Sequence, residues 1–208
     1  MITIIDYGVG NLFSLSCSLD YLALENQISR KAEDLRRADR IILPRVGAYA
    51  DAIRKLWESG LAEPLIEEAR NGKPVMGICL GMQLLFEKSY EYGEHEGLGL
   101  IPGVMSPLKG RIREDLKVPH MGWNSLRLTP EGKRHPLMKY TREGDYVYFV
   151  HSYYGTDCEE SLLATSEYGV PVTAAAACRN VMGTQYHPEK SGETGLRILK
   201  AFSEIEGR

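Results

Sequence analysis

The residue with the clearest potential for chemistry is Cys79, which lies between two glycines in the segment 77–81, Gly-Ile-Cys-Leu-Gly. An apolar run precedes it and a helical pattern follows, so the segment has the shape of a nucleophile elbow, a sharp turn that exposes a reactive side chain. Small residues two positions before and after the cysteine let this turn form without collision. The start of a helix favours negative charge, and therefore the thiolate, which is the nucleophilic form of cysteine.

His187 and Glu189 could supply the base that a thiol nucleophile needs. They flank Pro188 at what reads as the end of a strand, and alternate residues of an extended chain leave on the same side. The Glu189 carboxylate can then accept a hydrogen bond from one imidazole nitrogen, so that the other faces the thiol. The pattern predicts a catalytic triad of Cys79, His187 and Glu189, since triads are defined by geometry and not by chain order.

Each part of this pattern can also be explained as a purely structural feature with no catalytic role. A lone Gly-x-Cys-x-Gly is as often a buried core cysteine in a turn, and His-Pro-Glu alone is more often a surface turn. Gln83 lies one helical turn after Cys79 and could contact a substrate or face solvent. The two segments together favour a nucleophile with its base.

The elements that must position these residues follow a β-α pattern in the first half of the chain. Short apolar runs predict buried strands at 2–5, 40–43 and 75–78. Apolar residues at helical spacing predict helices behind Asn11 as N-cap, at 48–57 and at 62–70. The second half predicts strands at 123–128, 146–154, 162–166, 172–178 and 181–186, and a helix at 194–206. We expect a single α/β domain over 1–208, with a mostly parallel central sheet, helices on both faces and an antiparallel or mixed extension.

The composition is that of an ordinary globular protein, with 43% hydrophobic and 25% charged residues among 208. A formal net charge of −3 argues against nucleic acid or an anionic membrane as the main partner. The chain shows no basic leader and no apolar run of transmembrane length, so we expect a cytoplasmic protein. The four cysteines and five histidines lack the spacing of metal ligands and no phosphate loop is present, so we expect no metal and no cofactor.

Two segments resemble those of triad-type (class I) glutamine amidotransferases: 77–83, Gly-Ile-Cys-Leu-Gly-Met-Gln, and 186–191, Tyr-His-Pro-Glu-Lys-Ser. Within that family, further blocks resemble the glutaminase subunits of imidazole glycerol phosphate synthase, at 5–12, 43–48, 96–103, 119–124 and 149–154. Pro-His-Met-Gly-Trp-Asn at 119–124 is the most specific of them. The blocks follow the family order over nearly the whole chain, which makes a chance match implausible.

The resemblance implies a glutaminase reaction. The Cys79 thiolate would attack the side-chain amide of glutamine, His187 would protonate the departing ammonia, and water would release glutamate from the thioester. The implied oxyanion hole consists of the backbone amides of Val46 and Leu80. The implied substrate-binding residues are Gly47, Gln83, His151, Ser152 and Tyr153.

The resemblance also implies a partner, because ammonia is mostly protonated in neutral water and must travel through a dry passage. The family pairs this subunit with a β/α-barrel cyclase in a heterodimer. That cyclase uses the ammonia to form imidazole glycerol phosphate and aminoimidazole carboxamide ribonucleotide in histidine biosynthesis. The implied partner face carries Asn11, His120, Met121, Trp123, Asn124 and Lys190. Without the resemblance, Trp123 would be interpreted as a core aromatic residue.

Arg45 departs from the family, which usually has glycine here in Pro-Gly-Val-Gly. The family is thought to swing the next amide, that of Val46, into the oxyanion hole when the partner holds its ligand. Glycine tolerates positive φ, whereas arginine there costs on the order of 1 kcal/mol or more. Arg45 is therefore predicted to bias this strand toward one state. The alternative is that only ψ of residue 45 moves, which arginine allows.

Three other functions fit part of the pattern. The glutaminase subunit of pyridoxal phosphate synthase shares the elbow and the His-x-Glu pair, but its Gly-Gly-Glu-Ser-Thr block is absent from this sequence. A self-contained cysteine hydrolase or peptidase would act at full rate without a partner. A non-catalytic binding subunit, its oxyanion strand spoiled by Arg45, would only stabilise or regulate the barrel enzyme, although the intact triad speaks against it.

Overall fold

The computed structural model describes residues 1–8 and 10–207. Val9, which belongs to the 5–12 block, and Arg208 lie outside the described residues. Within the described ranges, no helix is both long and apolar enough to cross a membrane.

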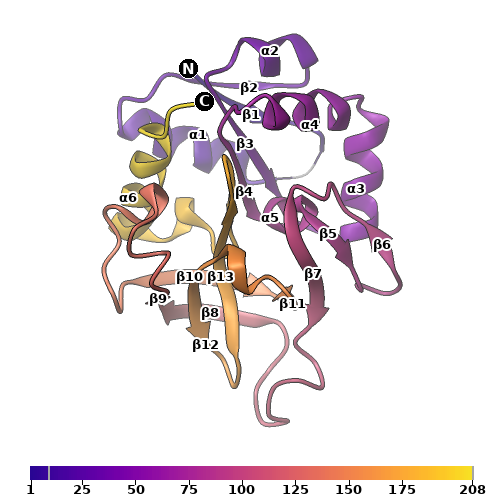
Figure 1. The fold of residues 1–208 in the computed structure, drawn as a ribbon, viewed down its shortest axis with the longest axis vertical. Helices are drawn as coiled ribbons and strands as arrows, with labels where there is room; N and C mark the ends of the chain where they lie inside the picture. The colour runs from indigo at the N-terminus through magenta and orange to yellow at the C-terminus, as the bar shows by residue number, and fades with distance from the viewer. Residues whose placement is uncertain (9, 208) are drawn as a thin grey trace.

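An eight-stranded sheet forms the centre of the fold, in the order β2-β1-β3-β4-β14-β13-β12-β9 (Figure 1). Its strands are β1 (Ile2–Ile5), β2 (Asn26–Ser29), β3 (Arg40–Arg45), β4 (Val75–Cys79), β9 (Arg127–Leu128), β12 (Leu162–Glu167), β13 (Pro171–Cys178) and β14 (Val181–Thr184). The first five strands in this order are parallel. The last three continue the sheet in antiparallel fashion. The expected α/β class with a mixed sheet extension is confirmed.

Helices cover both faces of the sheet because its parallel strands are apolar on both sides. In β3, Ile41 and Leu43 enter one core cluster and Ile42 enters the other. The helices α1 (Leu12–Tyr21) and α6 (Gly192–Ser203) bury leucine and isoleucine side chains in the cluster of Ile42. The other cluster receives α2 (Ala32–Arg37), α3 (Tyr49–Glu58) and α4 (Ala62–Arg70), and Figure 1 shows α3 and α4 on the opposite side from α1 and α6.

Two smaller sheets complete the second half of the chain. One has the order β11-β7-β5-β6 and consists of β5 (Phe86–Ser89), β6 (His95–Glu96), β7 (Ile101–Pro107) and β11 (Tyr153–Thr156). The other pairs β8 (His120–Ser125) with β10 (Tyr146–His151) in antiparallel fashion. Short 3-10 turns lie at Pro136–Met138, Glu159–Ser161 and Pro188–Lys190.

Several predicted strands are divided or shortened in the structure. The run predicted at 146–154 breaks at Ser152, because the chain leaves β8 as its neighbour and joins β7 instead. The run at 123–128 breaks at Leu126 between β8 and β9, and the run at 181–186 ends at Thr184. The closing helix begins and ends earlier than the predicted 194–206. Hydrophobic period alone does not show where a strand changes its neighbour.

Candidate active site

Cys79 ends β4, and α5 (Leu80–Leu85) begins at the next residue, so the chain turns from strand to helix at the thiol. Cys79 has φ 55° and ψ −115°, a backbone conformation that is strained for a residue with a side chain. The flanking glycines leave room for this turn. A Cβ atom at Gly81 would lie 1.8 Å from the Leu43 carbonyl oxygen, and one at Gly77 would lie 2.5 Å from the Met82 Cα. The structure therefore has the predicted elbow, with both glycines required by close backbone contact.

His187 and Glu189 lie together beside the elbow. The Nδ1 atom of His187 is 2.8 Å from Oε1 of Glu189, and both side chains are almost fully buried. The two residues were expected to meet as alternate positions of a strand, but a 3-10 turn over Pro188–Lys190 brings them together. Asn11 occupies the N-cap position of α1 without a side-chain cap bond, and instead its Nδ2 donates to Oε1 of Glu189 at 3.2 Å.

The electrostatics of this pair favour a charged imidazole. Burial disfavours the imidazolium, but the neighbouring Cys79 sulfur and Glu189 carboxylate outweigh it and raise the pKa of His187 to about 10. Burial also acts on Glu189, yet His187 and Asn11 hold the pKa of this carboxyl below its ordinary value. A proton that leaves the thiol can therefore be held on His187.

The resting thiol does not yet point its proton at the base. The Sγ atom of Cys79 donates to the Val150 carbonyl at 3.7 Å, while Nε2 of His187 is buried and makes no hydrogen bond with any described residue. The ring nitrogen opposite Glu189 is thus free to receive the proton. Catalytic hydrogen bonds are often loose before substrate binds, so this geometry suits a base at rest.

A cavity of about 290 Å³ opens in front of Cys79. This volume is near the lower end of the range for small-molecule pockets, about 300–1,000 Å³. The lining residues are Val46, Gly47, Cys79, Leu80, Gln83, Glu91, Pro119, Val150, His151, Ser152 and Tyr153. Every residue predicted for the oxyanion hole and for substrate binding is among them. Their individual roles stay predictions.

Four residues of this site had no predicted role: Glu91, Pro119 and Val150, which line the cavity, and Gln185. Gln185 is fully buried, and its Nε2 donates to Sγ of Cys79 at 3.8 Å. The alternation argument that singled out His187 and Glu189 reaches Gln185 as well, so a signal for it existed. Glu91 had no such signal, because it follows β5 in a loop whose course the sequence does not indicate.

The predicted partner face is divided between outward and inward side chains. Met121 and Trp123 are 60% and 52% exposed, and Lys190 is also exposed. His120 and Asn124 point the other way, since alternate residues of β8 leave on opposite faces. Asn124 is half-buried and donates from Nδ2 to the Glu167 carbonyl.

His120 is buried, so its side chain offers no surface for direct contact. Its ring stacks against Tyr168 at a centroid distance of 3.9 Å, and its Nδ1 lies 2.9 Å from Nε2 of His151. Nδ1 of His151 lies 2.9 Å from the Tyr153 carbonyl. His120 therefore lies in the interior, whereas Asn11 is half-buried and bonded to Glu189. Their predicted roles at a partner face stay predictions.

Arg45 lies beside Cys79 in the β3–β4 ladder. Its φ is not positive, so the steric penalty predicted for arginine at this position does not arise in this state. The guanidinium is buried over the Tyr7 ring at 4.8 Å, and Nη2 lies 3.3 Å from Oδ2 of Asp51. A Cβ at Gly8 would lie 2.2 Å from Nη1 of Arg45, so glycine makes room for the guanidinium there. Arg45 thus ties the strand before Val46 to the loop after β1 and to α3.

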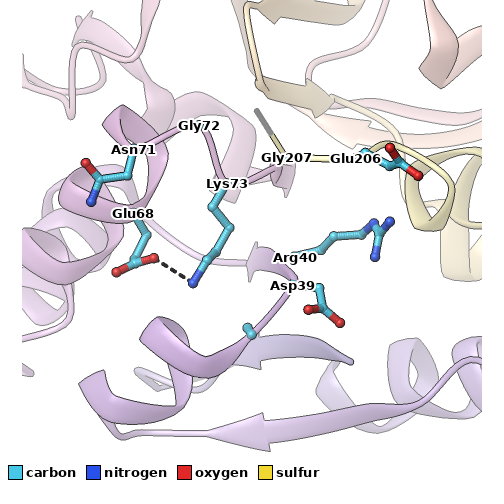
Figure 2. Close-up of a pocket in the computed structure, with 9 residues that line it drawn as sticks. Asp39, Arg40, Glu68, Asn71, Gly72, Lys73, Glu206 and Gly207 are labelled. Atoms are coloured by element: carbon cyan, nitrogen blue, oxygen red, sulfur yellow. Dashed lines mark ion pairs between the residues drawn. The ribbon is translucent and has the colours of Figure 1, made fainter.

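A larger surface hollow of about 410 Å³ lies at the opposite end of the sheet, where β3 and β4 begin (Figure 2). Figure 2 shows Lys73 reaching Glu68, at 2.6 Å, and Lys73 also donates to the Leu35 and Arg36 carbonyls. Nε of Arg40 donates to the Ile205 carbonyl. These charges hold neighbouring elements together, and the hollow contains no nucleophile with a base. Across residues 1–8 and 10–207, no group of three or more His, Cys, Asp or Glu side chains is placed to hold a metal ion.

The sequence and the fold agree with a known class of proteins. Residues 3–204 match the family described as glutamine amidotransferase class-I, and the chain belongs to this family. Two solved structures share the fold. A crystal structure of a glutamine amidotransferase has a TM-score of 0.74 at 16% identity and covers 97% of this chain and 98% of its own. A chain of PurLQS from Thermotoga maritima has a TM-score of 0.73 at 20% identity and covers 97% and 96%.

Sequence relatives are more specific. The chain is 48% identical over 207 residues to the imidazole glycerol phosphate synthase subunit HisH of Wolinella succinogenes, which covers 99% of this chain and 100% of the relative. The subunit HisH of Listeria monocytogenes is 48% identical over 205 residues, with 99% and 96% covered. The subunit HisH of Caldanaerobacter subterraneus is 48% identical over 207 residues, with 99% and 98% covered.

Proposed function

We propose that this chain is the glutaminase subunit of an imidazole glycerol phosphate synthase. The observation that carries the proposal is the elbow thiol of Cys79 beside the buried His187–Glu189 pair, in a chain that is similar over its length to relatives of that name. The cavity before the thiol has a size that suits a free amino acid.

The proposed reaction begins when the Cys79 thiol gives its proton to Nε2 of His187. The sulfur attacks the side-chain amide carbon of glutamine, and the oxygen charge that develops is stabilised by the amides of Val46 and Leu80. Leu80 is the first residue of α5, where a backbone N–H has no partner within the helix. The imidazolium returns the proton to the leaving nitrogen, the C–N bond breaks, and ammonia departs. Water activated by His187 then cleaves the thioester to glutamate.

The cavity can also hold the amino-acid end of glutamine. Glu91 is a half-buried carboxylate on its wall, and its Oε2 accepts from the Tyr49 amide at 2.6 Å. Burial raises the pKa of Glu91, and a ligand ammonium beside it would favour the charged carboxylate. We infer that Glu91 pairs with the α-ammonium group, while the backbone near His151, Ser152 and Tyr153 contacts the rest of the amino-acid end.

The proposed partner is a β/α-barrel cyclase in a cytoplasmic heterodimer. Met121 and Trp123 support this part of the proposal, because aromatic and methionine side chains are enriched at interface cores and both are exposed on β8. Trp123 also meets the Tyr148 ring, over which Lys190 extends at 6.0 Å. Trp123, Tyr148 and Lys190 thus lie together at the turn that follows His187.

The test is glutamate release from glutamine by the chain alone and with a barrel cyclase and its nucleotide. Cys79→Ala serves as the blank. A low basal rate that rises strongly with cyclase and nucleotide, and is absent in the blank, would support the proposal. Full activity of the chain alone, with no rise, would favour a self-contained hydrolase. No activity under either condition would favour a binding subunit.

A further inference from the structure

We propose that Gln185 acts directly on the nucleophile: its side-chain amide donates a hydrogen bond to the Cys79 sulfur and stabilises the thiolate, and Gln83 fixes the orientation of that amide. The inference deepens the proposed function and rests on Cys79 being the nucleophile of that reaction.

The orientation of the Gln185 amide follows from its neighbours. Nε2 of Gln83 lies 3.2 Å from the Tyr153 carbonyl and 2.9 Å from the side chain of Gln185. A backbone carbonyl can only accept, so Gln83 must direct its NH₂ group toward both partners. Gln185 must then present its oxygen to Gln83, which leaves its NH₂ group facing Sγ of Cys79, at 3.8 Å. The network therefore specifies a donor, and not an acceptor, at the sulfur.

Burial makes this contact obligatory for the protein. The Gln185 side chain is fully buried and that of Gln83 is nearly so. The backbone amide of Gln185 donates to the Ala174 carbonyl at 2.8 Å, which anchors the residue to β13. Buried amide groups need hydrogen-bond partners, and among the described residues the only partner of the Gln185 NH₂ group is the Cys79 sulfur.

Loss of the thiol proton changes what the sulfur requires. As a thiol, Cys79 donates to the Val150 carbonyl. When the proton moves from Sγ to Nε2 of His187, no other bond is made or broken, the sulfur becomes negative, and it can then only accept. The thiolate can no longer hydrogen-bond to the Val150 carbonyl, which only accepts, but it can accept a hydrogen bond from the Gln185 N–H. A hydrogen bond to a charged acceptor is shorter and stronger than one to a neutral acceptor.

Gln185 is uncharged, so its replacement by leucine removes no titratable group from the surroundings of the sulfur. The titratable groups near the sulfur are His187, with Glu189 behind it, and the cavity residues His151, Tyr153 and Glu91, while Arg45 lies on the neighbouring strand. Burial lowers the pKa of His151 to about 3, so this ring is neutral at ordinary pH. A change in sulfur reactivity in a Gln185 variant therefore reports the amide itself.

The test is the rate of Cys79 alkylation by iodoacetamide from pH 5 to pH 9.5, measured on the whole chain without glutamine or partner. Peptide mapping separates Cys79 from the exposed Cys17. Gln185→Leu is expected to slow alkylation at pH 7 by a factor of about ten and to move its pH midpoint upward, since it removes one hydrogen bond to a charged group. Gln185→Glu keeps the shape but replaces the donor by an oxygen, and a larger loss is expected.

The matched control is Thr173→Val. Thr173 contacts the sulfur of Cys158, a buried cysteine outside the cavity, at the same distance of 3.8 Å. This variant is expected to leave Cys79 alkylation unchanged. An unchanged pH profile in folded Gln185→Leu would overturn the proposal.

A second measurement needs no variant of Gln185. In ¹⁵N-labelled wild-type protein, the side-chain amide signal of Gln185 is expected to follow the pH midpoint of Cys79 alkylation and to lose this response in Cys79→Ala. A Gln185 amide signal with the same pH response in wild type and in Cys79→Ala would also overturn the proposal. Because these assays use neither glutamine nor cyclase, their outcome is independent of whether the chain supplies ammonia to a synthase.

Discussion

The buried pair of His120 and His151 makes the stability of the fold sensitive to acid. The Tyr153 carbonyl can only accept, so His151 must carry its proton on Nδ1, and its Nε2 must accept from Nδ1 of His120. His151 is therefore neutral, and burial favours the neutral form of His120 as well. Burial lowers the pKa of His120 to about 4 and that of His151 to about 3, against about 6.5 in an unfolded chain.

The size of the effect follows from these values. Each folded-state pKa lies below the unfolded value, so at acid pH the unfolded chain binds more protons than the folded chain does. Stability from the pair is complete above about pH 6.5 and is lost as the pH falls toward 4. Between pH 7.5 and 5.0, each histidine is expected to remove about 2 kcal/mol from the free energy of unfolding, or about 4 kcal/mol for the pair.

Urea unfolding at pH 7.5 and 5.0 measures this directly, with wild type compared to His120→Phe. The variant removes one of the two imidazole rings, so its free energy of unfolding is expected to fall by about 2 kcal/mol less than that of wild type on acidification. His187, whose pKa is raised, contributes in the opposite direction, but equally in both proteins. Leu126→Ala, which weakens the same core cluster without touching either histidine, is the control and should lose as much as wild type on acidification. Equal losses in wild type and His120→Phe would refute the reasoning.

Three further predictions concern the elbow, the oxyanion strand and the base. Gly81→Ala is expected to lower the free energy of unfolding by about 3 kcal/mol or more, because the new Cβ would collide with backbone atoms. Gly10→Ala is the control: its Cβ would make only ordinary contacts, so the free energy of unfolding should change by less than about 0.5 kcal/mol. Thermal unfolding of both variants measures the difference. Arg45→Gly is expected to change the ratio of stimulated to basal glutaminase rate, because it removes the arginine contacts that hold the strand before the proposed oxyanion amide. An unchanged ratio would refute a role of Arg45 in this strand. Glu189→Gln should lower the pKa of His187 and reduce glutamate release about 100-fold or more; a near wild-type rate would mean that the carboxylate is dispensable.

The part of the site that the sequence could predict is the part carried by local pattern. Gly77 and Gly81 on either side of Cys79, between an apolar run and a helical pattern, predict the elbow, and the structure gives the reason, since a Cβ at either position would strike backbone. The buried parallel strands are similarly visible, since strands covered on both faces read as continuous apolar runs. His187 was placed correctly beside Glu189, although a 3-10 turn and not a strand brings them together.

The rest depends on contacts between distant segments. Nothing near Gln185 in the sequence shows that its amide will meet Gln83, which precedes it by 102 positions. The inward direction of His120 depends on which face of β8 is covered by Tyr168, a residue of a later segment. The break at Ser152 depends on β7 taking over from β8 as the neighbour. Such features follow from strand partners, which a single sequence does not reveal.

The position of β14 has a consequence for how the protein comes to be made. It is the last strand in the described part of the chain, yet it lies in the middle of the sheet, between β4 and β13, and His187, the proposed base, follows shortly after its end at Thr184. A nascent polypeptide on the ribosome has its thiol long before it has the strand that joins the two halves of the sheet. With His187 as the base, as proposed, a chain that ends before β14 has the thiol without its base and is expected not to hydrolyse glutamine. A translation product that stalls before His187 is then expected to release no ammonia.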